Sequence, residues 1–141
     1  MKILLPVDGS ACAQRAVDLF LARRNEWRTM PELHLLHVHP PIPIGMVQAH
    51  IGHDTLQRHY REESEAEMQA ARQCLDAAGV AYSTHIHVGQ PAEVIARLAG
   101  ELDCDQVLMG THGRGAMGTL MLGSVAAKVV HLSSCAVELV K

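Results

Sequence analysis

The sequence is poor in aromatic residues and has no excess of basic ones. Phe, Trp and Tyr together make up 3% of the chain, and the formal net charge is −3. Proteins that bind nucleic acids present basic patches, and those that bind single strands add aromatic stacking platforms. No apolar stretch approaches the roughly 20 residues that cross a bilayer. These shortages predict a protein that binds neither nucleic acid nor membrane, and we expect it to be cytoplasmic.

The four cysteines, Cys12, Cys74, Cys104 and Cys135, are far apart in the sequence. None belongs to a CxxC pair, so the pattern predicts neither a disulfide framework nor a structural zinc site. We expect each cysteine to be a small buried hydrophobic residue.

Ten histidines raise the question of a metal site. A transition-metal site needs three or four ligands that meet in space. The candidates fall into three pairs: His37 with His39, His85 with His87, and His50 with His53. Nothing in the sequence brings these pairs together, so scattered surface and strand-end histidines are the expected outcome.

What the chain does have is the size and composition of one folded domain. It is 141 residues long, with 48% hydrophobic and 19% charged residues. Such a chain is long enough to bury a core and too apolar to be disordered. It contains no internal repeat, low-complexity tract or interdomain linker, which predicts a single domain over residues 1–141.

Strand and helix patterns alternate along the whole chain. Ile3 to Val7 is a continuous apolar run, typical of a strand that is buried on both faces of a parallel sheet. Ser10 is placed to cap a helix that we expect to reach about Arg24. The remaining predicted elements are a strand at Leu33–Val38, a helix from Asp54 to Gly79, a strand at Ala81–Val88, a helix from Pro91, a strand at Val107–Met109, a helix at Val125–Leu132 and a strand at Ala136–Val140.

Five strands separated by helices predict an α/β fold. The expected architecture is an open, mostly parallel, five-stranded Rossmann-like sheet with helices on both faces. Ligands of such sheets bind beyond the carboxyl ends of the strands, where the strand order reverses. Three loops lie at that edge: residues 8–10, residues 38–40 and the glycine-rich segment after the fourth strand. We therefore expect a binding site where these loops meet.

The glycine-rich segment is the strongest functional signal. It runs from Met109 through Gly110 to Gly113, and Gly123-Ser124 follows where a new helix begins. Glycines let backbone N–H groups come close to an anion, and the start of a helix presents unpaired N–H donors with a favourable dipole. With Ser124 as the helix cap, this arrangement predicts a phosphate-binding site.

Two common nucleotide fingerprints do not account for this segment. Residues 113–118 spell GxGxxG, but the dinucleotide fingerprint should follow the first strand and lead directly into a helix. Here the glycines follow the fourth strand, so we interpret the match as a coincidence. The P-loop pattern GxxxxGK[ST] is absent because no lysine precedes Ser124.

Four segments resemble the universal stress protein family, and the likeness covers nearly the whole chain. They are Ile3–Ser10, Leu35–Val38, Gly89–Pro91 and Met109–Ser124. The last one matches the family's nucleotide-binding pattern of Gly, two residues, Gly, nine residues and Gly-Ser. The resemblance implies the fold of the adenine nucleotide alpha hydrolases, ATP as the ligand together with Mg²⁺, and a homodimer. It places the chain with those family members that bind ATP.

The resemblance also implies particular contacts with ATP. Asp8 and the backbone near Pro6 and Val7 would meet the adenine, and the Val38 backbone would reach the edge of the base. Met109 and Gly110 would line the ribose. The phosphates would be held by Gly113, Arg114, Gly123, Ser124 and Val125. Arg114 supplies a positive charge for this purpose, and the Ser124 hydroxyl is available to a metal that accompanies the nucleotide.

One departure from the family concerns the last strand, which often pairs across a dimer in its members. The family usually has proline where this chain has Ala136. Alanine restores an N–H donor, so the pairing could change in detail. The apolar Val137, Leu139 and Val140 still suit a dimer through residues 136–140.

Three functions from different classes remain open. The preferred one is an ATP-binding stress or signalling module that responds to nucleotide. The second is a slow ATP hydrolase, which would need a positioned metal and an oriented water. Asp103 and Asp105 precede the fourth strand and so lie at the wrong edge, while His112 is expected to be solvated. The third is a dimerising interaction protein that does not use nucleotide.

Two further segments are ambiguous. The charged run from Arg61 to Glu67 is expected to form the solvated face of the long helix. The connection from Pro40 to His53 carries several apolar residues and is either a lid or partner surface, or an ordinary connection packed on its own sheet edge.

Overall fold

Strands and helices follow one another in a repeated order. The computed structural model describes residues 1–43, 52–114 and 122–141. In these ranges the strands are β1 (Lys2–Pro6), β2 (Glu32–His39), β3 (Tyr82–Val88), β4 (Gln106–Gly110) and β5 (Ala136–Val140). The helices are α1 (Ala11–Ala22), α3 (His53–Ala77), α4 (Pro91–Glu101) and α5 (Ser124–Leu132), with a short 3-10 helix at Arg23–Asn25.

All described strands lie in one parallel sheet. Their order is β3-β2-β1-β4-β5, and each neighbouring pair is parallel. Leu4 of β1, for example, lies opposite His34 of β2 on one side and Val107 of β4 on the other. The chain builds outward from β1 in one direction and then returns to add β4 and β5 in the other. The carboxyl ends of β1 and β4 therefore flank the position where the strand order reverses, which is where such sheets bind ligands.

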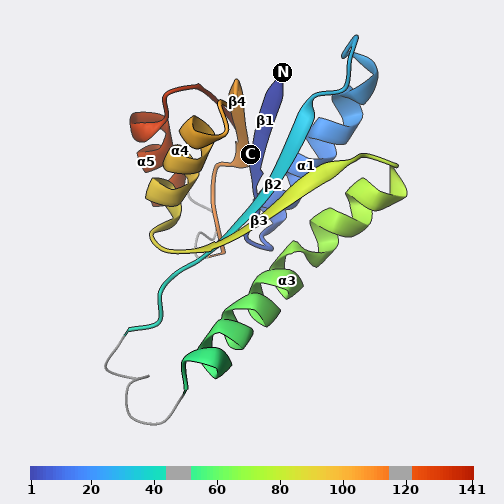
Figure 1. Ribbon diagram of the computed structural model, residues 1–141. Helices are drawn as coiled ribbons and strands as arrows, with labels where there is room; N and C mark the ends of the chain where they lie inside the picture. Colours follow the sequence, from blue (N-terminus) through green and yellow to red (C-terminus); the bar gives the residue numbers. More distant parts are fainter. Residues whose placement is uncertain (44–51, 115–121) are drawn as a thin grey trace.

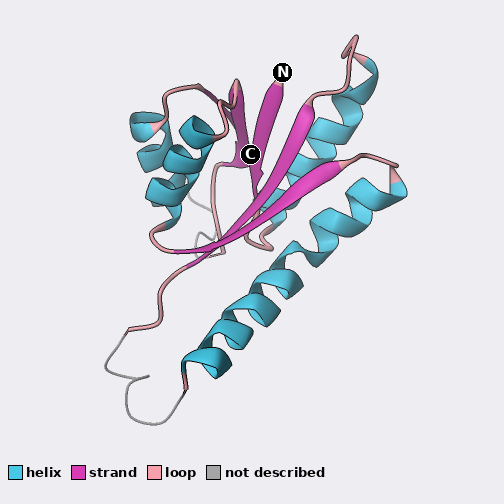
Figure 2. Ribbon diagram, viewed as in Figure 1, coloured by secondary structure: helices cyan, strands magenta, loops and turns pink. Residues whose placement is uncertain are grey.

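Helices cover both faces of the sheet (Figures 1 and 2). α1 and α3 pack on one face, where Phe20 and Met68 are fully buried together with Leu5 of β1. α4 and α5 pack on the other face against Leu4 and Val107. Successive side chains of a strand point to opposite faces, so a central strand covered on both sides must be apolar throughout. This requirement explains the uninterrupted run in β1 and confirms the predicted fold class.

The ends of the helices agree with the predicted signals at three positions. Ser10 caps α1, since its Oγ accepts a hydrogen bond from the Ala13 N–H at 3.2 Å. Gly79 has φ +67 and follows the end of α3, a conformation that suits glycine. Pro91 occupies the first turn of α4.

Two boundaries differ from the prediction. α1 ends at Ala22, and the chain to Asn25 tightens into the 3-10 helix. α3 begins at His53 with Gly52 in the cap position, so Asp54 lies inside the first turn. There its carboxylate still interacts favourably with the helix dipole.

The cysteines are less buried than the sequence suggests. Cys104 is buried, and desolvation raises the pKa of its thiol to about 11. Cys12, Cys74 and Cys135 are only half-buried. The expectation of four buried cysteines was therefore wrong for these three, which lie near helix and strand surfaces; the Cys12 thiol, for instance, accepts a hydrogen bond from the exposed Arg15 side chain at 2.7 Å.

Candidate functional site

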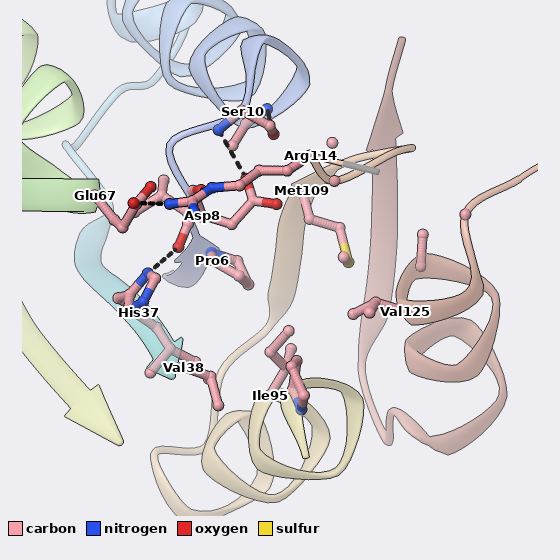
Figure 3. A pocket seen from close by; sticks show the side chains of 18 of the residues that line it. Pro6, Asp8, Ser10, His37, Val38, Glu67, Ile95, Met109, Arg114 and Val125 are labelled. Carbon is pink, nitrogen blue, oxygen red and sulfur yellow. Dashed lines mark hydrogen bonds and ion pairs between the residues drawn. The ribbon is translucent and has the colours of Figure 1, made fainter. Parts of the chain in front are cut away.

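A cavity of about 690 Å³ opens at the carboxyl edge of the sheet (Figure 3). Its size falls within the range of about 300–1,000 Å³ that is common for small-molecule sites. The ends of β1, β2 and β4 form its floor, and α3, α4 and α5 contribute its walls. All eleven residues that the sequence assigned to a nucleotide line it: Pro6, Val7, Asp8, Val38, Met109, Gly110, Gly113, Arg114, Gly123, Ser124 and Val125.

One half of the cavity is apolar. Pro6, Val38, Ile95, Met109 and Val125 surround the same space in Figure 3. They come from β1, β2, α4, β4 and α5, five elements that only the folded sheet brings together. Such an apolar slot is suited to a flat ring. Ile95 was predicted to face inward on its helix but was not among the predicted site residues, because nothing local marks it as lining a cavity instead of the core.

Glycines allow the loop after β4 to pass close to its neighbours. A Cβ on Gly110 would lie 2.7 Å from the backbone carbon of Cys12, at the start of α1. A Cβ on Gly113 would lie 2.7 Å from Asp8 Oδ2. Real Cβ atoms do not approach other atoms this closely. Gly110 therefore requires glycine because its neighbour is backbone, whereas a side chain at Gly113 would force the Asp8 side chain to move.

The start of α5 faces the cavity, but its cap is not the predicted one. Gly123 holds the cap position with φ −60 and ψ 148, and Ser124 is the first helical residue without a side-chain cap bond. The prediction of a Ser124 cap was therefore wrong by one position. The Ala127 N–H donates to the Gly123 carbonyl at 2.9 Å and makes the first hydrogen bond of the helix. The N–H groups of residues 124–126 therefore have no acceptor within the helix. Both these groups and the Ser124 hydroxyl are available to a ligand.

The polar half of the cavity is built around Asp8. Its Oδ1 accepts a hydrogen bond from the Ser10 N–H at 3.0 Å, and its backbone carbonyl accepts one from Arg114 Nε at 2.9 Å. The guanidinium of Arg114 also forms an ion pair with Glu67 of α3 (Figure 3). The glycine loop is thus tied to β1 and α3 by charged groups.

Glu67 corrects the expectation that residues 61–67 form only a solvated helix face. Its side chain is 25% exposed and lines the cavity, as does that of Glu63 one turn earlier. The signal was present in the helical period, because these two residues flank a stripe formed by the buried Tyr60, Ser64 and Met68. What the period could not show is that the stripe ends at the site.

Two histidines of β2 also line the cavity. His37 is buried, its Nδ1 lies 2.8 Å from the Val7 carbonyl, and desolvation lowers the pKa of the ring. The neutral ring therefore carries its proton on Nδ1, because a carbonyl can only accept. His39 Nε2 lies 2.6 Å from Glu63 Oε2, and this hydrogen bond lowers the pKa of the Glu63 carboxyl.

The other predicted polar candidates differ in their outcomes. Asp105 precedes β4, at the edge opposite the cavity as predicted, and its Oδ2 accepts a hydrogen bond from the Lys2 N–H at 2.6 Å. His112 was expected to be solvated, but it is half-buried and lines the cavity, with Nδ1 2.9 Å from Thr111 Oγ1. Residues 44–51 of the ambiguous connection and residues 115–118 of the GxGxxG match lie outside the described ranges.

The described members of the histidine pairs do not gather into a metal centre, and His50 lies outside the described ranges. Within residues 1–43, 52–114 and 122–141, no group of three His, Cys, Asp or Glu residues could hold a metal ion. The structure does reveal a pair that sequence reasoning missed: His34 Nδ1 and His85 Nε2 lie 3.0 Å apart across β2 and β3. Register alone decides this contact, since the two residues are 51 positions apart. In the same described ranges, no helix is long and apolar enough to cross a membrane.

The sequence is similar to known universal stress proteins. The model of the universal stress protein family matches residues 1–141. A universal stress protein from Thermus aquaticus is 31% identical over 140 residues, which cover 99% of this chain and 97% of that protein. Universal stress protein MJ0531 of Methanocaldococcus jannaschii is 26% identical over 140 residues, covering 99% of this chain and 81% of the relative.

Solved structures share the fold of this chain. The structure of protein MJ0577 superposes with a TM-score of 0.84 and 31% identity, covering 99% of this chain and 94% of that one. A universal stress protein in complex with cAMP has a TM-score of 0.71 at 24% identity, covering 100% and 97% of the two chains. One from Arabidopsis thaliana with AMP bound has a TM-score of 0.67 at 18% identity, covering 100% and 91%. The last two likenesses show the fold alone. Since the family model spans the whole chain, this protein belongs to the universal stress protein family.

Proposed function

We propose that this protein is an ATP-binding universal stress protein, acting in the cytoplasm as a nucleotide-responsive stress or signalling module with little or no ATP hydrolysis. The observation that carries the proposal is the convergence of the predicted nucleotide contacts. They come from loops far apart in the sequence, and they line one cavity at the edge where the strand order reverses. Relatives of the same fold were solved with cAMP and with AMP, which supports an adenine nucleotide as the ligand.

The residues present fit such a ligand. The slot between Pro6, Val38 and Met109 is apolar enough for the base. The phosphates belong at the other end, between Gly113 and the free N–H groups at the start of α5, where a helix dipole favours negative charge. At Gly113 a side chain would displace the Asp8 carboxylate from its place in the cavity.

Mg²⁺ is proposed to accompany the triphosphate. The Ser124 hydroxyl is exposed and not engaged in capping the helix, so it can serve as one oxygen ligand. Low hydrolysis is proposed because the cavity's carboxylates have structural partners. Asp8 accepts from the Ser10 N–H, Glu63 from His39 and Glu67 from Arg114. Phosphoryl transfer also requires a group that orients an attacking water, and we assign no cavity residue to that role.

We also propose that the domain of residues 1–141 forms a homodimer through the last strand. β5 is an edge strand of the sheet, and Val137, Leu139 and Val140 are only half-buried in the single chain. An edge strand offers unpaired backbone groups to a partner. Sedimentation equilibrium at micromolar concentration tests this part, and a monomer mass would reject it.

Thermal unfolding with and without Mg-ATP tests nucleotide binding. A ligand at 100 times its dissociation constant stabilises the folded state by about 2.7 kcal/mol. For a chain of this size each kcal/mol raises the melting temperature by roughly 3 °C, so we expect a rise of about 8 °C. No rise at millimolar Mg-ATP would reject the proposal and favour a purely dimerising protein. Phosphate released over hours in a binding-competent sample would instead identify a slow hydrolase.

A further inference from the structure

The side chain of Arg114 is directed away from the expected phosphate site. It leaves the glycine loop, passes over Asp8 and reaches α3, whereas Val125 and the start of α5 lie on the opposite side of the cavity (Figure 3). Its Nε donates to the Asp8 carbonyl at 2.9 Å, and its guanidinium pairs with the Glu67 carboxylate. Before it can neutralise a phosphate at α5, Arg114 must leave this pair.

Glu67 is the fixed partner in the pair. It is carried by α3 next to the buried Met68, and its side chain is 25% exposed, against 58% for Arg114. Its carboxylate also lies against Gly9, where a Cβ would overlap Glu67 Oε2. Gly9 has φ +73, a backbone conformation that residues other than glycine rarely adopt. The turn after β1 therefore makes room for the Glu67 carboxylate. Arg114 is the more exposed residue of the ion pair and has room to reorient.

The cavity is short of positive charge. Among the described lining residues, Arg114 is the only lysine or arginine, whereas three lining residues carry carboxylates: Asp8, Glu63 and Glu67. A ligand with several phosphates gains most from Arg114 and is repelled most by Glu67. Adenosine, which has no phosphate, is affected by neither.

We propose that Glu67 determines the phosphate preference of the site by competing with the ligand's phosphates for Arg114. The inference rests on the proposed nucleotide binding and adds a residue from α3 to the site. In the wild-type protein this competition lowers the ratio of the affinity for ATP to the affinity for AMP. Removing the charge of Glu67 releases Arg114 and raises that ratio.

Isothermal titration with adenosine, AMP and ATP, each with Mg²⁺ at low salt, tests the proposal on the full chain. We expect Glu67→Gln to tighten ATP binding about two- to fivefold, because ion pairs exposed to this degree are weak. The affinity for AMP should increase less, and the affinity for adenosine should not change. Glu65→Gln is the matched control, since it removes the same charge from the same helix and pairs with Arg61 instead of the cavity.

A double-mutant cycle separates competition from simple repulsion. With Arg114→Gln already present, adding Glu67→Gln should no longer tighten ATP binding. If the gain persists there in full, if adenosine gains as much as ATP, or if Glu67→Gln leaves ATP affinity unchanged or weaker, the inference is wrong while the proposed function stands. If the wild-type protein retains no nucleotide at all, the proposed function fails as well.

Discussion

Replacing Gly113 with valine should disable the proposed phosphate site without unfolding the protein. Gly113 is exposed, and its φ lies outside the left-handed region, so its backbone accepts a side chain. The new Cβ, however, would lie 2.7 Å from Asp8 Oδ2, closer than real Cβ atoms approach. Because this oxygen is the end of a side chain, Asp8 must rotate away, and the isopropyl group takes its place at the mouth of the cavity.

The effects on stability and on ATP affinity can be estimated from the contacts that Asp8 loses. Rotation removes the acceptor of the Ser10 N–H, and Ser10 is buried. We therefore expect the free energy of unfolding to fall by about 1–3 kcal/mol, which a folded domain of this size tolerates. The nucleotide loses the proposed contact of its base with the carboxylate. A hydrogen bond to a charged group is worth about 1.5–3 kcal/mol, and every 1.4 kcal/mol is about tenfold in affinity. The loss should therefore be at least tenfold, before the steric effect on the phosphates is added.

Titration calorimetry with Mg-ATP measures the affinity, and urea unfolding measures the stability. Gly100→Val is the matched control, because Gly100 is also exposed and a Cβ there meets only Ser134 Oγ at an ordinary 3.7 Å. The control should bind like the wild type. Equal ATP affinity in wild type and Gly113→Val would refute the role given to the loop, and a variant that fails to fold would refute the expectation that Asp8 can rotate away at a tolerable cost.

Two further predictions concern stability. The lowered pKa of His37 means that the unfolded chain takes up its proton before the folded one, so stability should fall as pH drops below about 6.5, by at most about 1.4 kcal/mol per pH unit. Urea unfolding at pH 7.5 and 5.5 should show a smaller difference in stability for His37→Asn, whose amide nitrogen occupies the position of Nδ1 and can still donate to the Val7 carbonyl; an undiminished difference would exclude His37 as a source. Gly100→Ala should stabilise α4 by about 0.5–1 kcal/mol, because alanine loses less conformational freedom in a helix and the new Cβ has room. A melting temperature at or below that of the wild type would contradict it.

The fold could be predicted because its signals are local and repeated. A central strand covered on both faces must be apolar at every position, and the run from Ile3 to Val7 meets this condition. Ser10 and Gly79 mark helix ends through their own backbone chemistry. One error lies where two neighbouring residues suit the same task. Ser124 and Gly123 can both cap a helix, and only the path of the loop decides between them.

The site was predictable in one part and hidden in the other for a single physical reason. Gly110, Gly113 and Gly123 each leave little room for a Cβ beside their neighbours, so the sequence marks these positions with glycines at a fixed spacing. Contacts made by α3 depend on how a 25-residue helix crosses the end of the sheet. A carboxylate on its solvent side and one at the cavity look alike in the sequence. If Glu67 tunes the site as proposed, relatives that share the glycine spacing can still differ in ligand preference through one helix face. The glycine pattern then indicates that phosphate is bound, and α3 determines how much negative charge is accepted.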